Sequence, residues 1–215
     1  MEELQKAILK TLSYADIFDY PLALPELHHF LIGQKASIND LAKALTKIKE
    51  VTQDGQFFFL KNRRKIVQIR RKRFKWSQNK LQIAQKVAKW LELIPFIKMI
   101  AVTGNLAMNN SDKNDDIDLL VVTTKNRLWL TRLLTVFLVE LVANRRHPQD
   151  VEVKDKICLN MFLDENHLQV PLKEQDLFSA HEVCQTKLLW DKNETYQKFL
   201  KANQWYKKYL ANWKP

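Results

Sequence analysis

The chain has 215 residues, a formal net charge of +11, 46% apolar residues and only three glycines. This composition is typical of packed globular cores, in one large domain or two small ones, and excludes long disordered segments. No apolar run reaches the ~18 residues of a membrane span, and the N-terminus lacks the basic-then-apolar order of a signal peptide. The two cysteines have no CxxC spacing. We therefore expect a cytoplasmic protein with no membrane partner.

The first sixty residues predict three short helices followed by a hairpin. A helical stripe ends near Ser13, Pro25 begins a second helix, and Ser37 caps a third helix in INDLAKALTKIKE. Two β-prone runs flank Asp54-Gly55, which is a strong hairpin signal. This order predicts a winged helix-turn-helix domain in residues 1–78. Its third helix offers lysines but no arginine for bidentate reading of guanine, so DNA binding by this domain stays open.

Residues 61–80 hold ten basic residues and no acidic residue, whereas the remainder of the chain is nearly neutral. Such a block is a candidate surface for the phosphates of nucleic acid or of a nucleotide. It is equally typical of a solvated helix face. The candidate basic phosphate contacts are the four consecutive residues Arg70, Arg71, Lys72 and Arg73.

The pattern from Arg63 to Pro95 predicts one long helix that links the first domain to a second one in residues 79–215. There, FIKMIAVTG, IDLLVVTT and KICLNMFLD predict three strands, with a short helix beginning near Asn105. NRLWLTRLLTVFLVELVANRR predicts a buried core helix, and the C-terminal part predicts further helices. The fold class is therefore α+β, with a winged helix domain followed by an α/β domain that has a small mixed sheet and C-terminal helices.

The segment between the first two strands of the second domain carries candidate chemistry. Gly104 follows an apolar strand, where the lack of a Cβ lets a phosphate approach closely. Asp116 and Asp118 are one residue apart in an extended segment, so both carboxylates project from the same side. Two such carboxylates repel each other unless a cation lies between them, and oxygen ligands select Mg²⁺ or Mn²⁺. The alternative is an acidic loop that caps a strand edge.

This segment resembles the signature of the polymerase-beta-like nucleotidyltransferase superfamily, in which Gly is followed about ten residues later by Asp, an apolar residue and a second acid. Here Gly104-Asn105 precedes ten residues and then Asp116-Ile117-Asp118. The segments YADIFDYPLALPELHHFLI and RLWLTRLL resemble bacterial members with an N-terminal winged helix. The resemblance implies that Gly104 and Asn105 hold a nucleoside triphosphate and that Asp116 and Asp118 bind Mg²⁺ or Mn²⁺. It also implies transfer of a nucleoside monophosphate from an NTP to a hydroxyl group.

The family places a third carboxylate on the next strand, often as the base toward the acceptor. Alternation along KICLNMFLD gives Cys158, Asn160 and Phe162 as the outward positions, and we take Asn160 as the counterpart of the third carboxylate. An amide cannot act as a base. Glu152, Asp155 or Asp164 are the alternatives. The sequence therefore favours a Mg²⁺-dependent nucleotidyltransferase, and it leaves open a nucleic-acid-binding or regulatory protein with a catalytically degenerate nucleotidyltransferase domain. In that second interpretation, residues 61–80 contact nucleic acid.

Overall fold

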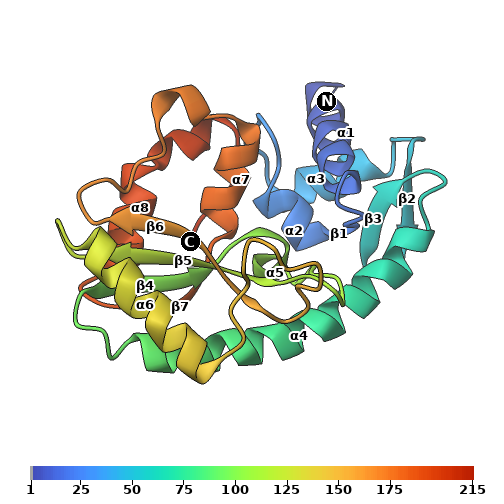
Figure 1. Cartoon of the computed structure of the whole chain (residues 1–215). Coiled ribbons are helices and arrows are strands. Elements are labelled where there is room, and N and C mark those ends of the chain that lie inside the picture. Colours follow the sequence, from blue (N-terminus) through green and yellow to red (C-terminus); the bar gives the residue numbers. More distant parts are fainter. Residues whose placement is uncertain (1) are drawn as a thin grey trace. The chain divides into compact units, whose positions relative to one another are not determined.

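The structure is a computed structural model that describes residues 2–215 (Figure 1). Over these residues it contains eight α-helices and two small sheets, which confirms the α+β class. The chain divides into two compact units. The first holds the residues up to Lys72 together with Gln175–Cys184 and Trp205–Pro215, and the second holds Arg73–Glu174 and Gln185–Gln204. The predicted domain division into 1–78 and 79–215 stays a prediction.

The first unit begins with the three predicted helices and the predicted hairpin. The elements are α1 (Glu2–Asp16), β1 (Leu22–Ala23), α2 (Leu24–His29), α3 (Ile38–Leu45), β2 (Val51–Asp54) and β3 (Phe57–Leu60). The three strands form an antiparallel sheet in the order β1-β3-β2. Gly55 turns the hairpin with a φ of 60°, a backbone conformation that glycine adopts without strain.

Local signals fix where the helices of this unit begin. The backbone N–H of Asp40 donates to Ser37 Oγ at 3.2 Å, which confirms Ser37 as the cap of α3. Pro25 lies in the first turn of α2, where its missing N–H costs no hydrogen bond. The backbone N–H of Ala23 donates to Glu26 Oε2 at 2.8 Å and satisfies another donor at this helix start.

Two segments from the end of the chain complete the core of the first unit. The helix α7 (Leu177–Gln185) carries His181, whose ring stacks on Tyr14 with centroids 4.2 Å apart. Burial lowers the pKa of His181 to about 4. Near the C-terminus, Asn212 Nδ2 donates to the carbonyl oxygen of His28 at 2.9 Å. The first unit therefore contains contacts between residues almost two hundred positions apart.

The second unit is built on a four-stranded sheet. Its elements are the part of α4 (Lys65–Leu91) from residue 73 onward, β4 (Ile97–Val102), α5 (Gly104–Ala107), β5 (Ile117–Thr123), α6 (Leu128–Val142), β6 (Ile157–Asp164), β7 (Lys187–Asp191) and α8 (Thr195–Ala202). The strand order is β6-β5-β4-β7, with β5 and β6 parallel and the other pairs antiparallel. The predicted small mixed sheet is thus confirmed.

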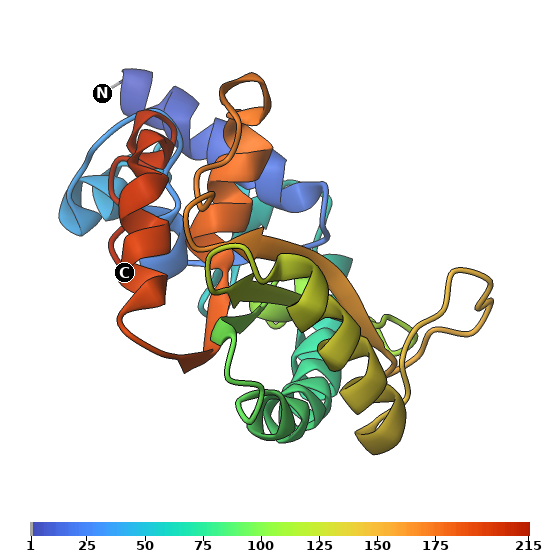
Figure 2. The same ribbon diagram turned by 60° about the vertical axis from the view of Figure 1, so that its left-hand side comes forward.

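The core of the second unit lies on one face of this sheet, against α4 and α6 (Figure 2). The alternate residues Ile117, Leu119 and Val121 of β5 point into it and are fully buried. The intervening residue at the start of the strand, Asp118, points to the other face and is only half-buried. Alternation along β5 therefore fixes the side on which the candidate carboxylates lie.

The helix α6 corrects the sequence analysis, which predicted a buried core helix. It buries one narrow face, Thr131, Thr135 and Val139, while a stripe of large apolar residues on the opposite side is exposed, namely Trp129, Leu133, Phe137 and Leu141. One sheet face covers only part of a helix that is apolar almost all round. Among the described residues, no helix combines the length and the apolar character that crossing a membrane requires.

Candidate functional site

The turn after β4 brings a glycine next to a carboxylate. The backbone N–H of Thr103 donates to the carbonyl oxygen of Asp118 at 3.2 Å, which ties this turn to β5. Gly104 follows with a φ of 61°, in the left-handed region that favours glycine. A Cβ on Gly104 would lie 3.5 Å from Asp118 Oδ2. The glycine therefore serves both the backbone turn and the free approach to Asp118, and Asn105 next to it is exposed.

Asp116 and Asp118 lie together, as the spacing predicted. Their carboxylate oxygens and Cys158 Sγ lie within 4.8 Å of one another, which forms a group of metal-ligating atoms within residues 2–215. Burial raises the pKa of Asp118, and the negative charge of Asp116 raises it further. Both causes disfavour the ionised pair unless a positive charge is close.

Arg146 supplies one such positive charge, and the sequence analysis did not identify it. Its Nη1 donates to Asp116 Oδ2 at 2.6 Å, and its backbone N–H donates to the carbonyl oxygen of Ile157 at 2.9 Å. The arginine lies thirty residues after Asp116, in the segment between α6 and β6, and belongs to no motif. The sequence indicated only that some positive charge should lie near the two aspartates, because a carboxylate pair at a strand end requires a nearby cation.

The residue beside Asp118 on the neighbouring strand is Cys158, whereas the sequence analysis placed Asn160 at the third position. In the parallel pairing of β5 with β6, Asp118 faces Cys158 and Leu120 faces Met161, so β6 holds one extra residue at this point. Strict alternation fails across such a bulge. Asn160 falls within the bulge and is exposed. The third position of the site therefore carries a thiol, and burial followed by the charge of Asp118 raises the pKa of that thiol to about 12.

The other acidic residues considered for the third position have different roles. Asp155 Oδ1 accepts a hydrogen bond from Lys80 at 2.6 Å. Asp164 accepts from the backbone N–H groups of Asn126 and Asn166, at 2.7 and 2.9 Å. Glu152 is exposed, and within the described residues none of the three belongs to the group around Asp118.

The helix α4 holds the acidic loop that leads into β5. Lys80 is almost completely buried, and its Nζ donates to the carbonyl oxygens of Asp115 and Lys113, at 2.6 and 3.3 Å, as well as to Asp155. One helical turn earlier, Ser77 Oγ accepts from the backbone N–H of Ser111 at 3.0 Å. These bonds satisfy buried polar groups of the loop. The loop that positions Asp116 is therefore fastened to α4 at two points.

The predicted phosphate contacts in the basic segment separate into two kinds. Arg70 donates to both carboxylate oxygens of Glu26, at 2.6 and 2.8 Å, and its guanidinium lies 4.2 Å from the ring centroid of Tyr20. Arg73 is largely buried, with its Nε 4.0 Å from a carboxylate oxygen of Asp112. Both side chains therefore have structural contacts, and they are poor candidates for phosphate binding.

Arg71 and Lys72, in contrast, are exposed. They line a groove in the first unit together with residues of the hairpin and of the first turns of α4, namely Asp54, Arg64, Lys65, Val67, Gln68 and Ile69. Since Lys80 is buried as well, only part of the basic segment 61–80 presents charge to a partner.

No protein-family model matches the sequence, and no curated protein matches it. Among solved structures, the chain is similar to one described as the crystal structure of a toxin-antitoxin with AMP-PNP. The similarity covers 55% of this chain and 82% of that chain, with 17% sequence identity and a TM-score of 0.30. At this level of similarity the comparison carries no conclusion about function.

Proposed function

We propose that the chain is a nucleotidyltransferase that transfers a nucleoside monophosphate from an NTP to a hydroxyl acceptor. The observation that carries the proposal is the meeting of Asp116 and Asp118 beside Gly104. The two carboxylates come from one strand end, and the glycine leaves the space next to Asp118 free of a side chain. This combination suits a divalent cation that is shared with phosphate oxygens.

The two carboxylates of the site, Asp116 and Asp118, suit Mg²⁺ or Mn²⁺. Two carboxylates supply the oxygen ligands that these ions prefer. The guanidinium of Arg146 already binds Asp116, which indicates that the pair attracts a cation.

The residues have separate tasks in the proposed reaction. Asp116 and Asp118 would hold the ion, and Gly104 with Asn105 would leave room for the triphosphate and donate to it. When bound, a divalent metal neutralises charge on the α-phosphate and lowers the pKa of the attacking hydroxyl. The acceptor oxygen bonds to the α-phosphorus as the bond to the bridging oxygen breaks, and pyrophosphate leaves. Because no third carboxylate stands beside Asp118, we expect the hydroxyl proton to pass to water.

Mg²⁺-dependent binding of labelled NTPs tests the proposal. Replacing both Asp116 and Asp118 with Asn keeps their shape and removes the charge, so we expect the metal-dependent affinity to fall by more than roughly tenfold, or about 1.4 kcal/mol. Asp112→Asn is the matched control, since Asp112 lies in the same loop but outside the group of ligating atoms. Equal metal-dependent binding in wild type and in the double variant would overturn the site assignment.

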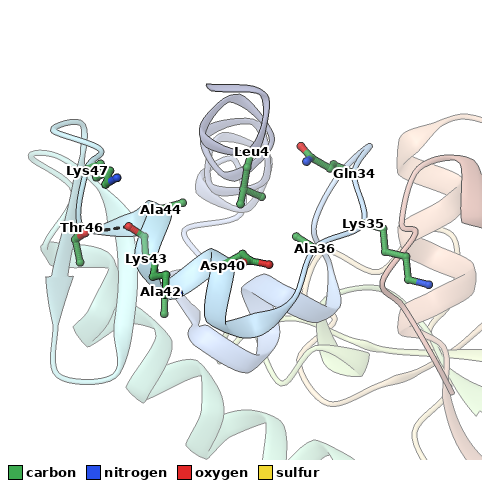
Figure 3. A pocket seen from close by; sticks show the side chains of 10 residues that line it. All are labelled: Leu4, Gln34, Lys35, Ala36, Asp40, Ala42, Lys43, Ala44, Thr46 and Lys47. Carbon is green, nitrogen blue, oxygen red and sulfur yellow. Dashed lines mark hydrogen bonds between the residues drawn. The ribbon is translucent and has the colours of Figure 1, made fainter. Parts of the chain in front are cut away.

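We propose nucleic-acid binding by the first unit as a second function, and we interpret that unit as a winged helix-turn-helix domain. Three helices precede an antiparallel hairpin, and β1 adds a third strand to it. A pocket of about 770 Å³ lies along α3, where Lys35, Lys43 and Lys47 line it (Figure 3). The groove that Arg71 and Lys72 line is also basic. Basic grooves of this kind suit a phosphate backbone.

Duplex binding measured against salt concentration tests this second function. Each lost phosphate contact should reduce the slope of log K against log salt by about 0.9. We expect Arg71→Gln/Lys72→Gln to reduce both the slope and the affinity at low salt, whereas Lys10→Gln, an exposed lysine on α1, serves as the control. Lack of any duplex affinity at low salt would remove the second function.

A further inference from the structure

The third position of the carboxylate site carries sulfur. Cys158 Sγ lies within 4.8 Å of ligating oxygens of both Asp116 and Asp118. The cross-strand pairing of Cys158 with Asp118 holds this contact in place. A side chain with this position points its sulfur at the carboxylates, so the donor set consists of two oxygens and one sulfur.

The second cysteine provides a comparison within the same chain. Cys184 is buried, whereas Cys158 is only partly buried, and Cys184 belongs to α7 in the first unit and to no group of metal-ligating atoms among the described residues. Its burial is what an ordinary packed thiol shows. Cys158 differs from it because its sulfur lies within 4.8 Å of ligating oxygens of two carboxylates.

Sulfur changes which ions the site prefers. Thiolate is a soft ligand that favours Zn²⁺ and Co²⁺, whereas Mg²⁺ is bound almost only through oxygen. We propose that Cys158 is a metal ligand and that it gives this site a preference for thiophilic divalent ions over Mg²⁺. On coordination the S–H bond is replaced by a metal–sulfur bond and the proton passes to solvent. The inference rests on the proposed metal-dependent function and specifies which ion serves it.

Titration with Co²⁺ tests the inference without any measurement of activity. A sulfur-to-cobalt charge-transfer band in the near ultraviolet appears only when cobalt is bonded to a thiolate. We expect this band in the wild type and in Cys184→Ser, and we expect Cys158→Ser and Asp116→Asn/Asp118→Asn to lack it. Loss of even an outer partner of a metal site costs about 10–100-fold in affinity, so Cys158→Ser should weaken Co²⁺ binding by at least about tenfold. Its Mg²⁺ affinity should remain within a factor of about two.

Placing a carboxylate at position 158 should shift the metal preference of the site in the opposite direction, toward Mg²⁺. Cys158→Asp supplies an oxygen ligand in place of sulfur, and we expect it to strengthen Mg²⁺ binding while the charge-transfer band disappears. Thermal melting of each variant reports whether it folds, and Cys158→Ala serves as a second test if Cys158→Ser unfolds. Co²⁺ binding to the wild type without the band, or equal Co²⁺ affinity in wild type and Cys158→Ser, would overturn the inference. Failure of Co²⁺ to bind at all would overturn it too.

The two proposals fail in different ways. If the band is absent while NTP binding still requires Mg²⁺, Asp116 and Asp118, the proposed function stands and the inference is wrong. If the band is present and depends on Cys158 while no nucleotide binds under any of these ions, the metal site stands and the nucleotidyltransferase function is wrong.

Discussion

Replacing Lys80 with Met removes the buried ammonium group that fastens the acidic loop to α4. The methionine side chain has a similar length and fills the same space, so the change removes mainly charge and hydrogen bonds. Three acceptors then lose their donor, namely the carbonyl oxygens of Asp115 and Lys113 and the carboxylate of Asp155. The variant therefore measures how strongly α4 holds the loop that leads to Asp116.

The expected magnitude follows from the burial of the two partners. Breaking a buried ion pair by removing one partner costs about 3–5 kcal/mol of unfolding free energy. The Asp155 side chain is 37% exposed, so water can solvate it after the change, and we expect the lower end, about 3 kcal/mol. For a chain of this size 1 kcal/mol shifts the melting temperature by about 2–4 °C, which predicts a loss of about 6–12 °C.

Thermal and urea unfolding measure this loss. Lys75→Met is the matched control, because Lys75 is exposed on the same helix and its replacement should stay within about 0.5 kcal/mol of wild type. In Lys80→Met/Asp155→Asn the two effects should not add, since the residues share one interaction. If Lys80→Met melts within about 2 °C of wild type, Lys80 does not fasten the loop and the reasoning is wrong.

Three further predictions concern single side chains. Burial lowers the pKa of His181 to about 4, so as the pH falls the unfolded chain binds a proton on this residue before the folded chain does. The neutral ring therefore contributes stability on the order of 3 kcal/mol, which is present above about pH 6.5 and is lost as the pH falls toward 4. His181→Phe should flatten this part of the pH profile in urea titrations, and an unchanged profile would contradict the assignment. Gly104→Ala should lower the unfolding free energy by roughly 1–2 kcal/mol because of the positive φ at Gly104, and it should weaken metal-dependent NTP binding. Gly55 has a similar φ with open space around it, so Gly55→Ala should cause the same loss of stability without affecting NTP binding. Arg146→Gln removes the cation that competes with a metal ion for Asp116. Calorimetry without nucleotide should therefore show Mn²⁺ binding about fivefold tighter, which corresponds to the about 1 kcal/mol of a partly exposed ion pair. Weaker Mn²⁺ binding in this variant would refute the competition.

The sequence predicted those elements whose signals are local. The Ser37 cap and the Asp54-Gly55 turn lie within a few residues of the structure that they determine, and both are confirmed. The short strand β7 was missed, because its identity depends on pairing with β4 and its sequence lies among helical stripes. The two-residue strand β1 is likewise defined only by its pairing with β3.

The candidate site shows the same division. Asp118 belongs to β5 and Asp116 directly precedes that strand, so their one-residue spacing was sufficient to place the two carboxylates together. Arg146 contacts Asp116 from thirty residues later in the chain, and Lys80 contacts the carbonyl oxygen of Asp115 from 35 residues earlier. Charge alone does not distinguish these two residues from exposed basic residues. The basic segment 61–80 looked uniform in sequence, yet Arg70 and Lys80 are largely buried and paired with carboxylates, while Arg71 is exposed.

The extra residue in β6 affects how this strand is aligned with strands of other proteins. Two steps along β5, from Asp118 to Leu120, correspond to three steps along β6, from Cys158 to Met161. An alignment without a gap here shifts one half of β6 by one column and exchanges its inward and outward side chains. A one-residue gap at positions 159–160 keeps both halves in phase. With that gap the residue paired with Asp118 is Cys158, and a search for sites of the same geometry should accept cysteine there.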